Sequence, residues 1–289
     1  MLTRRASLIL PLLALPALIG CSGGESTAPA PLDDAALKVV VEKPGAPREK
    51  LARAVDALFT DEAAEESRAV VVLYRGEVVA ERYGEGYGPE TRFVSWSMAK
   101  SVTAVMIGLL VSDGRLRLDE TAPIPAWQRS GDPRGGITLR QLLQMRSGLR
   151  HTESSEPIYG SDTIKMLFLG GRDNMAAWAE AQPLEAKPGS KFEYSSATTV
   201  ILADIAARAL TESRDPATRR IAVAEYLRTR LFEPVGMKSI VPEFDASGTL
   251  IGSSLMHATA RDWAKFGEFL RNGGSVKAHR WFHAAGSNS

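Results

Sequence analysis

The chain has 289 residues, of which 44% are hydrophobic and 24% are charged, with 25 glycines and 16 prolines. These fractions are typical of a globular protein and exclude a disordered or fibrous chain. The formal net charge is +1, from 35 Lys and Arg residues against 34 Asp and Glu residues. Because proteins that bind nucleic acid through a basic surface carry a clear positive excess, we expect no nucleic-acid partner.

The first twenty residues have the pattern of an export signal. Arg4 and Arg5 precede an apolar run from Leu8 to Ile19, which is too short to span a bilayer in a mature protein. The run ends in Leu18-Ile19-Gly20-Cys21, which resembles the lipobox of bacterial lipoproteins. The resemblance implies cleavage after residue 20 and a lipid on Cys21. The exported protein is then expected on a bacterial membrane, at the periplasmic face of the outer membrane. The alternative is an ordinary secretory signal with a chance cysteine.

A flexible tether is predicted over residues 21–46, because Ser22-Gly23-Gly24 and Ala28-Pro29-Ala30-Pro31 are typical of linkers. The folded domain is then expected to occupy residues 47–289. Cys21 is the single cysteine of the chain. The domain can therefore form no intramolecular disulfide and depends on core packing for its stability.

The remaining chain alternates between strand and helix patterns. A helix is expected over Pro47–Phe59, followed by a hairpin whose strands, Ala69–Tyr74 and Glu77–Tyr83, flank the turn Arg75-Gly76. The first strand is apolar throughout, which predicts cover on both faces. A buried helix then runs from Ser97 to Asp113. Further helices are expected from Thr138 through Leu143 and over Asn174–Glu180, Ser196–Leu210, Ala222–Leu231 and Ala258–Leu270. This order predicts an α+β fold, with an antiparallel sheet flanked by helices and a separate all-helical region.

Several common catalytic patterns are missing from the sequence. There is no Gly-x-Ser-x-Gly, so the motif of an α/β-hydrolase is not present. The four histidines lack metal-ligand spacing, and we expect neither a metal nor a cofactor. His151 is expected to be a solvated loop histidine.

Ser97-Met98-Ala99-Lys100 is the pattern that suggests chemistry. Positions three apart share a helix face, so the Lys100 amine can reach the Ser97 hydroxyl. A serine hydroxyl needs a base to become nucleophilic, and a lysine desolvated by apolar neighbours can supply one. We expect Val102, Ala104 and Val105 to be those neighbours. Taken alone, the spacing also fits a surface serine beside a solvated lysine.

A second motif lies about a hundred residues further on. Phe192-Glu193-Tyr194-Ser195-Ser196 follows Lys187-Pro188-Gly189-Ser190 and directly precedes a predicted helix. Together with Ser-x-x-Lys, this pattern resembles the serine β-lactamase and penicillin-binding-protein superfamily, in its class C β-lactamase-like branch. Other stretches that resemble this branch follow in the same order, among them Ser147-Gly148-Leu149, Leu231–Met237 and Ala258–Asp262.

The resemblance implies roles for four residues. Ser97 would be the acylated nucleophile, and Lys100 would be its proton acceptor or the group that lowers the pKa of Tyr194. Tyr194 would pass the proton to the leaving amine or alcohol. Ser196 stands where class C β-lactamases have Asn, so the amide that binds a β-lactam side chain is replaced by a hydroxyl. We expect Ser196 to contact the substrate instead. Tyr-x-Ser is more similar to 6-aminohexanoate-dimer hydrolases and related carboxylesterases.

The sequence thus predicts a serine hydrolase that cleaves small amides or esters through an acyl-enzyme. The alternatives are a D-Ala-D-Ala carboxypeptidase or β-lactamase-type enzyme, and an inactive truncated lipoprotein. The last alternative arises because the family's third motif, Lys-Thr-Gly or His-x-Gly on a late strand, has no counterpart before Ser289. We therefore expect a domain of β-lactamase/transpeptidase-like fold whose C-terminal strands are missing.

Overall fold

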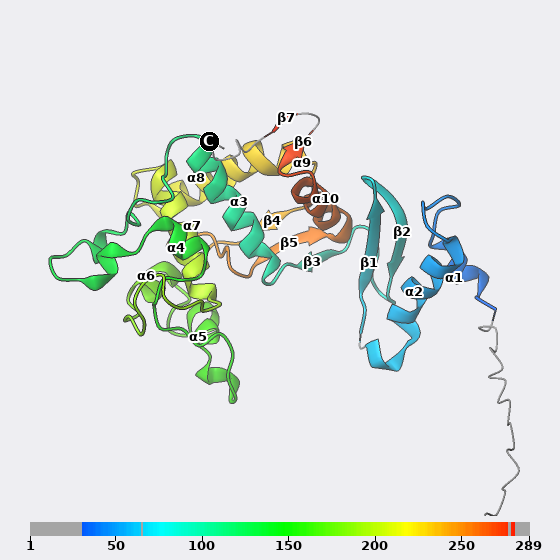
Figure 1. Cartoon of the computed structure of the whole chain (residues 1–289), viewed down its shortest axis with the longest axis horizontal. Coiled ribbons are helices and arrows are strands. Elements are labelled where there is room, and N and C mark those ends of the chain that lie inside the picture. Colours follow the sequence, from blue (N-terminus) through cyan, green and yellow to red (C-terminus); the bar gives the residue numbers. More distant parts are fainter. Residues whose placement is uncertain (1–30, 65, 277–278, 281–289) are drawn as a thin grey trace, which may run out of the picture.

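The structure, a computed structural model, describes residues 31–64, 66–276 and 279–280 (Figure 1). The expected signal over residues 1–20 and Cys21 lie outside the described residues. The helices are α1 (Asp34–Lys38), α2 (Arg48–Thr60), α3 (Met98–Ser112), α4 (Leu139–Leu143), α5 (Asp162–Phe168), α6 (Met175–Glu180), α7 (Ser196–Leu210), α8 (Pro216–Leu227), α9 (Glu233–Val235) and α10 (Ala260–Arg271). The strands are β1 (Ala69–Tyr74), β2 (Glu77–Tyr83), β3 (Arg92–Val94), β4 (Val241–Pro242), β5 (Met256–Thr259), β6 (Ser275–Val276) and β7 (His279–Arg280). In the described part of the chain, no helix is long and apolar enough to cross a membrane.

The structure describes the expected tether over residues 21–46 only from residue 31 onwards, and this described part contains a helix and a β-bridge. Helix α1 begins at Asp34, and Val40 pairs with Ala80 of β2 in an antiparallel bridge. The Arg48 guanidinium donates hydrogen bonds to the carbonyl oxygens of Leu37 and Val40 at 2.7 and 3.1 Å. Val40 is buried in a small apolar cluster with residues of α2 and β2. The composition of this segment is typical of a linker, but a few of its apolar side chains are buried against α2 and β2. Composition alone does not predict such a contact.

The predicted hairpin is confirmed. Tyr74 pairs with Glu77, and Arg75 and Gly76 form the connecting turn with φ values of 54° and 88°. The hairpin lies between α2 and α10, as Figure 1 shows. The side chains of β1 are half-buried rather than fully buried, so the expected complete cover is wrong. Among the described residues, β1 has one hydrogen-bonded neighbour, β2, which leaves its other edge without a strand.

A second small sheet leads directly into the helical region. Its strand order is β3-β5-β4, and all its pairs are antiparallel. Phe93 of β3 stands opposite Ala258 of β5. Strand β5 joins α10, where the Thr259 side chain caps the helix by accepting a hydrogen bond from the Asp262 N–H. The predicted helix at Ala258 therefore begins two residues later, because Met256–Thr259 is a strand.

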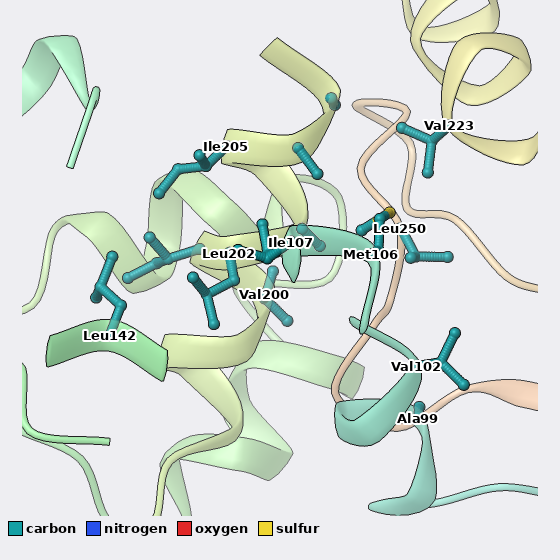
Figure 2. Close-up of a cluster of buried hydrophobic side chains, with 14 of the residues drawn as sticks. Ala99, Val102, Met106, Ile107, Leu142, Val200, Leu202, Ile205, Val223 and Leu250 are labelled. Carbon is teal, nitrogen blue, oxygen red and sulfur yellow. The ribbon is translucent and has the colours of Figure 1, made fainter. Parts of the chain in front are cut away.

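The main core is formed by helices, with α3 and α7 at its centre. Figure 2 shows apolar side chains of both helices, such as Ile107, Val200 and Ile205, gathered in one cluster. Helix α7 is buried from Ser196 to Ala207, as is typical of a helix enclosed on all sides, whereas α3 leaves Ser101 and Ala104 exposed. The sequence predicted α7 at Ser196–Leu210, and the structure confirms it.

The start of α8 differs from the prediction for a reason that lies in its capping. The helix begins at Pro216 and not at Ala222. The Asp215 side chain caps it by accepting a hydrogen bond from the Thr218 N–H. Proline at the first helical position and Asp at the cap are strong start signals. The helix ends at Leu227 and continues as a π-helical turn over Arg228–Phe232.

A cluster of buried charges joins α6, α7 and α8. Asp204 is 4% exposed and contacts both Arg219 and Arg208, each at 2.5 Å. Glu180 is 6% exposed and accepts a hydrogen bond from Arg208 at 3.1 Å. Burial and the charge of Asp204 raise the pKa of Glu180 to about 7, against the opposing charge of Arg208.

This shift predicts a pH-dependent stability. The folded state holds the Glu180 proton up to about pH 7, whereas the unfolded chain loses it near 4.5. The contribution of Glu180 to stability is therefore present below about pH 4.5 and is lost as the pH rises through 7. Urea titrations of the wild type and of Glu180→Gln give the difference between their unfolding free energies. We expect this difference, wild type minus variant, to decrease between pH 5 and pH 8. A difference that grows with pH would contradict the assignment.

Candidate active site

The residues before α3 hold Ser97 in a fixed place. Ser95 is buried, its N–H donates to the Met256 carbonyl at 2.7 Å, and its hydroxyl donates to the Ser254 carbonyl at 3.0 Å. Trp96 then has a φ of 42°, the left-handed region that bulky side chains rarely adopt. Backbone strain of this kind costs about 1–3 kcal/mol and collects at functional sites. The sharp bend presents Ser97 at the N-terminus of α3 with an exposed side chain.

Lys100 faces Ser97 from the first turn of α3, as the sequence predicts. Its Nζ lies within hydrogen-bond distance of three oxygens: Ser97 Oγ at 3.2 Å, Ser196 Oγ at 2.9 Å and the Ser253 carbonyl oxygen at 2.9 Å. The expected apolar surroundings are wrong, because three oxygens contact the amine. Val102 points into the core and Ala104 is exposed.

Tyr194 lies next to Lys100. Its ring centroid is 5.0 Å from Lys100 Nζ, so the amine lies over the ring face. Glu193 anchors this segment by donating its N–H to the Met145 carbonyl at 2.9 Å, and the Ser195 side chain caps α7. The Tyr194 side chain remains 39% exposed. Tyr194 is therefore brought together with Ser97 and Lys100 and remains open to a substrate.

Ser196, for which the resemblance implies contact with a substrate, is buried beside Lys100. It is the first residue of α7 and is only 1% exposed. Its hydroxyl accepts a hydrogen bond from Lys100 and donates one to Glu153 at 2.6 Å. Both contacts are made inside the protein, which favours a positioning role for Ser196 over direct contact with a substrate.

Glu153 is the residue of the site that sequence reasoning missed. Its carboxylate accepts hydrogen bonds from the N–H and the hydroxyl of Ser196, and Nε2 of His151 lies 2.7 Å from it. Burial by itself raises the pKa of Glu153, but the hydrogen bonds from His151 and Ser196 and the charge of Lys100 lower it to about 2. Glu153 is therefore an anion throughout the neutral range. No local pattern in the sequence marks it, because it lies on a loop.

His151 is buried and not solvated, in contrast to the expectation for a loop histidine. It is 5% exposed, and its contact with the acceptor-only carboxylate of Glu153 places a proton on Nε2. Within the described ranges, no group of three or more His, Cys, Asp or Glu side chains could hold a metal ion.

Comparisons with known proteins identify the family of the chain. The sequence profile of a family described as Beta-lactamase matches residues 55–286. A 6-aminohexanoate-dimer hydrolase of Paenarthrobacter ureafaciens is 26% identical over 261 residues, which cover 82% of this chain and 62% of that protein.

Solved structures share the fold. A Bacillus anthracis protein, provisionally assigned as a 6-aminohexanoate-dimer hydrolase, is 25% identical with a TM-score of 0.64 over 78% of this chain and 58% of that one. D-amino acid amidase from Ochrobactrum anthropi is 20% identical with a TM-score of 0.57 over 80% and 73% of the two chains. The chain thus spans about three fifths of the length of the first two relatives. The resemblance inferred from the motifs is confirmed, and the chain belongs to the Beta-lactamase family.

Proposed function

We propose that this chain is a serine hydrolase that cleaves small linear amides or esters through an acyl-enzyme on Ser97. One observation carries the proposal: Lys100 Nζ lies 3.2 Å from Ser97 Oγ, and the Tyr194 ring borders the same amine. A nucleophile within hydrogen-bond reach of a base, with that base held by further groups, is the arrangement that covalent catalysis requires.

The reaction follows from these positions. The Ser97 hydroxyl gives its proton to the neutral Lys100 amine while Oγ bonds to the substrate carbonyl carbon. The proton then passes, with help from Tyr194, to the leaving nitrogen or oxygen as its bond to carbon breaks. Water attacks the resulting ester by the same route in reverse and frees Ser97. The N–H groups of Met98 and Ala99 already donate hydrogen bonds to the carbonyls of Ser95 and Trp96. The Ser97 N–H is therefore the amide at the start of the helix that is proposed to bind the oxyanion.

The substrate class is proposed from two observations. The third position of Tyr-x-Ser carries a buried hydroxyl, so no side-chain carboxamide is present there to bind a β-lactam acylamino group. The relative from Paenarthrobacter ureafaciens is named for hydrolysis of the 6-aminohexanoate dimer. Both favour unbranched amides and simple esters over β-lactams.

A panel of four substrates tests the proposal. The purified chain is incubated with 6-aminohexanoate dimer, p-nitrophenyl butyrate, a peptide ending in D-Ala-D-Ala and benzylpenicillin, and product release and intact mass are measured. We expect release of 6-aminohexanoate and p-nitrophenol, with no long-lived penicilloyl adduct. A stable penicilloyl adduct with release of D-Ala would favour the carboxypeptidase alternative. A folded chain with neither turnover nor a fluorophosphonate adduct would reject the hydrolase.

A further inference from the structure

The hydrogen bonds around Ser196 have a fixed direction. Glu153 is ionised, and an ionised carboxylate can only accept hydrogen bonds. The Ser196 N–H therefore donates to Glu153 Oε2 at 2.8 Å, and the Ser196 hydroxyl proton must point to Oε1 at 2.6 Å. The Ser196 oxygen is then left as an acceptor towards Lys100 Nζ, 2.9 Å away.

The second partner of Lys100 is also a hydrogen-bond acceptor. The Ser253 carbonyl oxygen, 2.9 Å from Nζ, can also only accept. A neutral lysine amine has two N–H donors and one lone pair. When its two N–H groups point to Ser196 and Ser253, the lone pair faces the third neighbour, the Ser97 hydroxyl at 3.2 Å.

We propose that Glu153 is a positioning residue, which fixes the direction of the Ser196 hydroxyl so that neutral Lys100 accepts a proton from Ser97 alone. The inference rests on the proposed function, since it concerns the base that activates Ser97. His151 supports the same direction, because its Nε2 proton occupies Oε2 of Glu153 and it is shielded from solvent. Glu153 acts through Ser196, which contacts Lys100 in turn.

The isosteric variant Glu153→Gln tests the direction of these bonds. Glutamine offers one acceptor oxygen to three donors, the Ser196 N–H, the Ser196 hydroxyl and His151 Nε2. When its amide nitrogen faces the hydroxyl, the hydroxyl proton turns towards Lys100 and competes with Ser97 for the lone pair. We expect the limiting rate of Ser97 labelling by a fluorophosphonate to fall about 100-fold, the upper end of the loss seen when a supporting partner of a reactive ligand is removed. The probe concentration at half the limiting rate stays unchanged, because Glu153 does not contact the probe.

The double variant Glu153→Gln/Ser196→Ala separates this role from a structural one. Removing the misdirected hydroxyl leaves Ser97 as the remaining hydroxyl donor to Lys100, so the double variant is expected to label faster than Glu153→Gln. If the two substitutions only damaged the structure, the double variant would label more slowly than Glu153→Gln. Glu156→Gln is the matched control, because Glu156 is exposed on the same loop and loses the same charge.

Each outcome decides the inference. Two outcomes overturn the role of Glu153 when the wild type is labelled: an unchanged limiting rate in Glu153→Gln, or a double variant that labels no faster than Glu153→Gln. Both outcomes leave the proposed hydrolase function intact. A wild-type chain that is not labelled at Ser97 overturns both. If Glu153→Gln does not fold, Ser196→Ala alone removes the acceptor that directs Lys100. Its limiting rate is then expected to fall about tenfold, and an unchanged rate overturns the inference.

Discussion

Replacing Ser97 by alanine is expected to abolish the fluorophosphonate adduct and to lower amide turnover by roughly 10⁵- to 10⁶-fold, the order found when a serine nucleophile is removed. The reason is that no other oxygen takes its place beside Lys100: the Ser196 hydroxyl is committed to Glu153, and Ser253 contributes a carbonyl. The Ser97 side chain makes no capping hydrogen bond to α3, so the variant should fold normally. Intact mass, turnover and thermal unfolding of both proteins measure these effects.

The matched control is Ser101→Ala. Ser101 lies on the same helix, one residue after Lys100, and its side chain is exposed. This variant should keep the adduct and the wild-type turnover. An adduct that persists in Ser97→Ala and maps to another residue would contradict the assigned nucleophile.

Asp204→Ala is expected to lower the unfolding free energy by about 3–5 kcal/mol, the usual effect of removing one partner of a buried ion pair. Asp204 is buried on α7 and contacts both Arg208 and Arg219. Arg219 is itself 8% exposed, and its remaining side-chain partner is the Thr249 hydroxyl at 3.3 Å. The substitution therefore leaves a buried guanidinium without its carboxylate.

Urea unfolding at pH 7 measures this loss, with Asp173→Ala as the control. Asp173 forms an exposed pair with Arg172 at 3.5 Å, and such pairs contribute about 0–1 kcal/mol. A loss below about 1 kcal/mol in Asp204→Ala would show that water or neighbouring groups replace the carboxylate. Activity measured in the same variant at low urea separates a loss of stability from damage to the site.

Local patterns explain what could be predicted from the sequence. The hairpin around Arg75-Gly76 and the helices α3 and α7 were predicted correctly, because turn residues and apolar periodicity depend on near neighbours. The predicted starts of α8 and α10 are wrong because apolar spacing alone does not set them. The Asp215 cap sets the start of α8, and the strand Met256–Thr259 sets the start of α10. The composition around α1 is typical of a linker, and its few apolar residues are buried only by contact with α2 and β2.

The active site shows the same division. The sequence by itself determined that Ser97 and Lys100 lie on one helix face, because residues three apart share a face, and the resemblance to the family added Tyr194. Only the tertiary structure decided that Ser196 is buried, that the Ser253 carbonyl contacts Lys100, and that Glu153 directs the Ser196 hydroxyl. These contacts join residues 96, 153 and 43 positions apart. Such separations leave no periodic trace in the sequence, because the chain between the partners can follow many paths and only the packed core selects one.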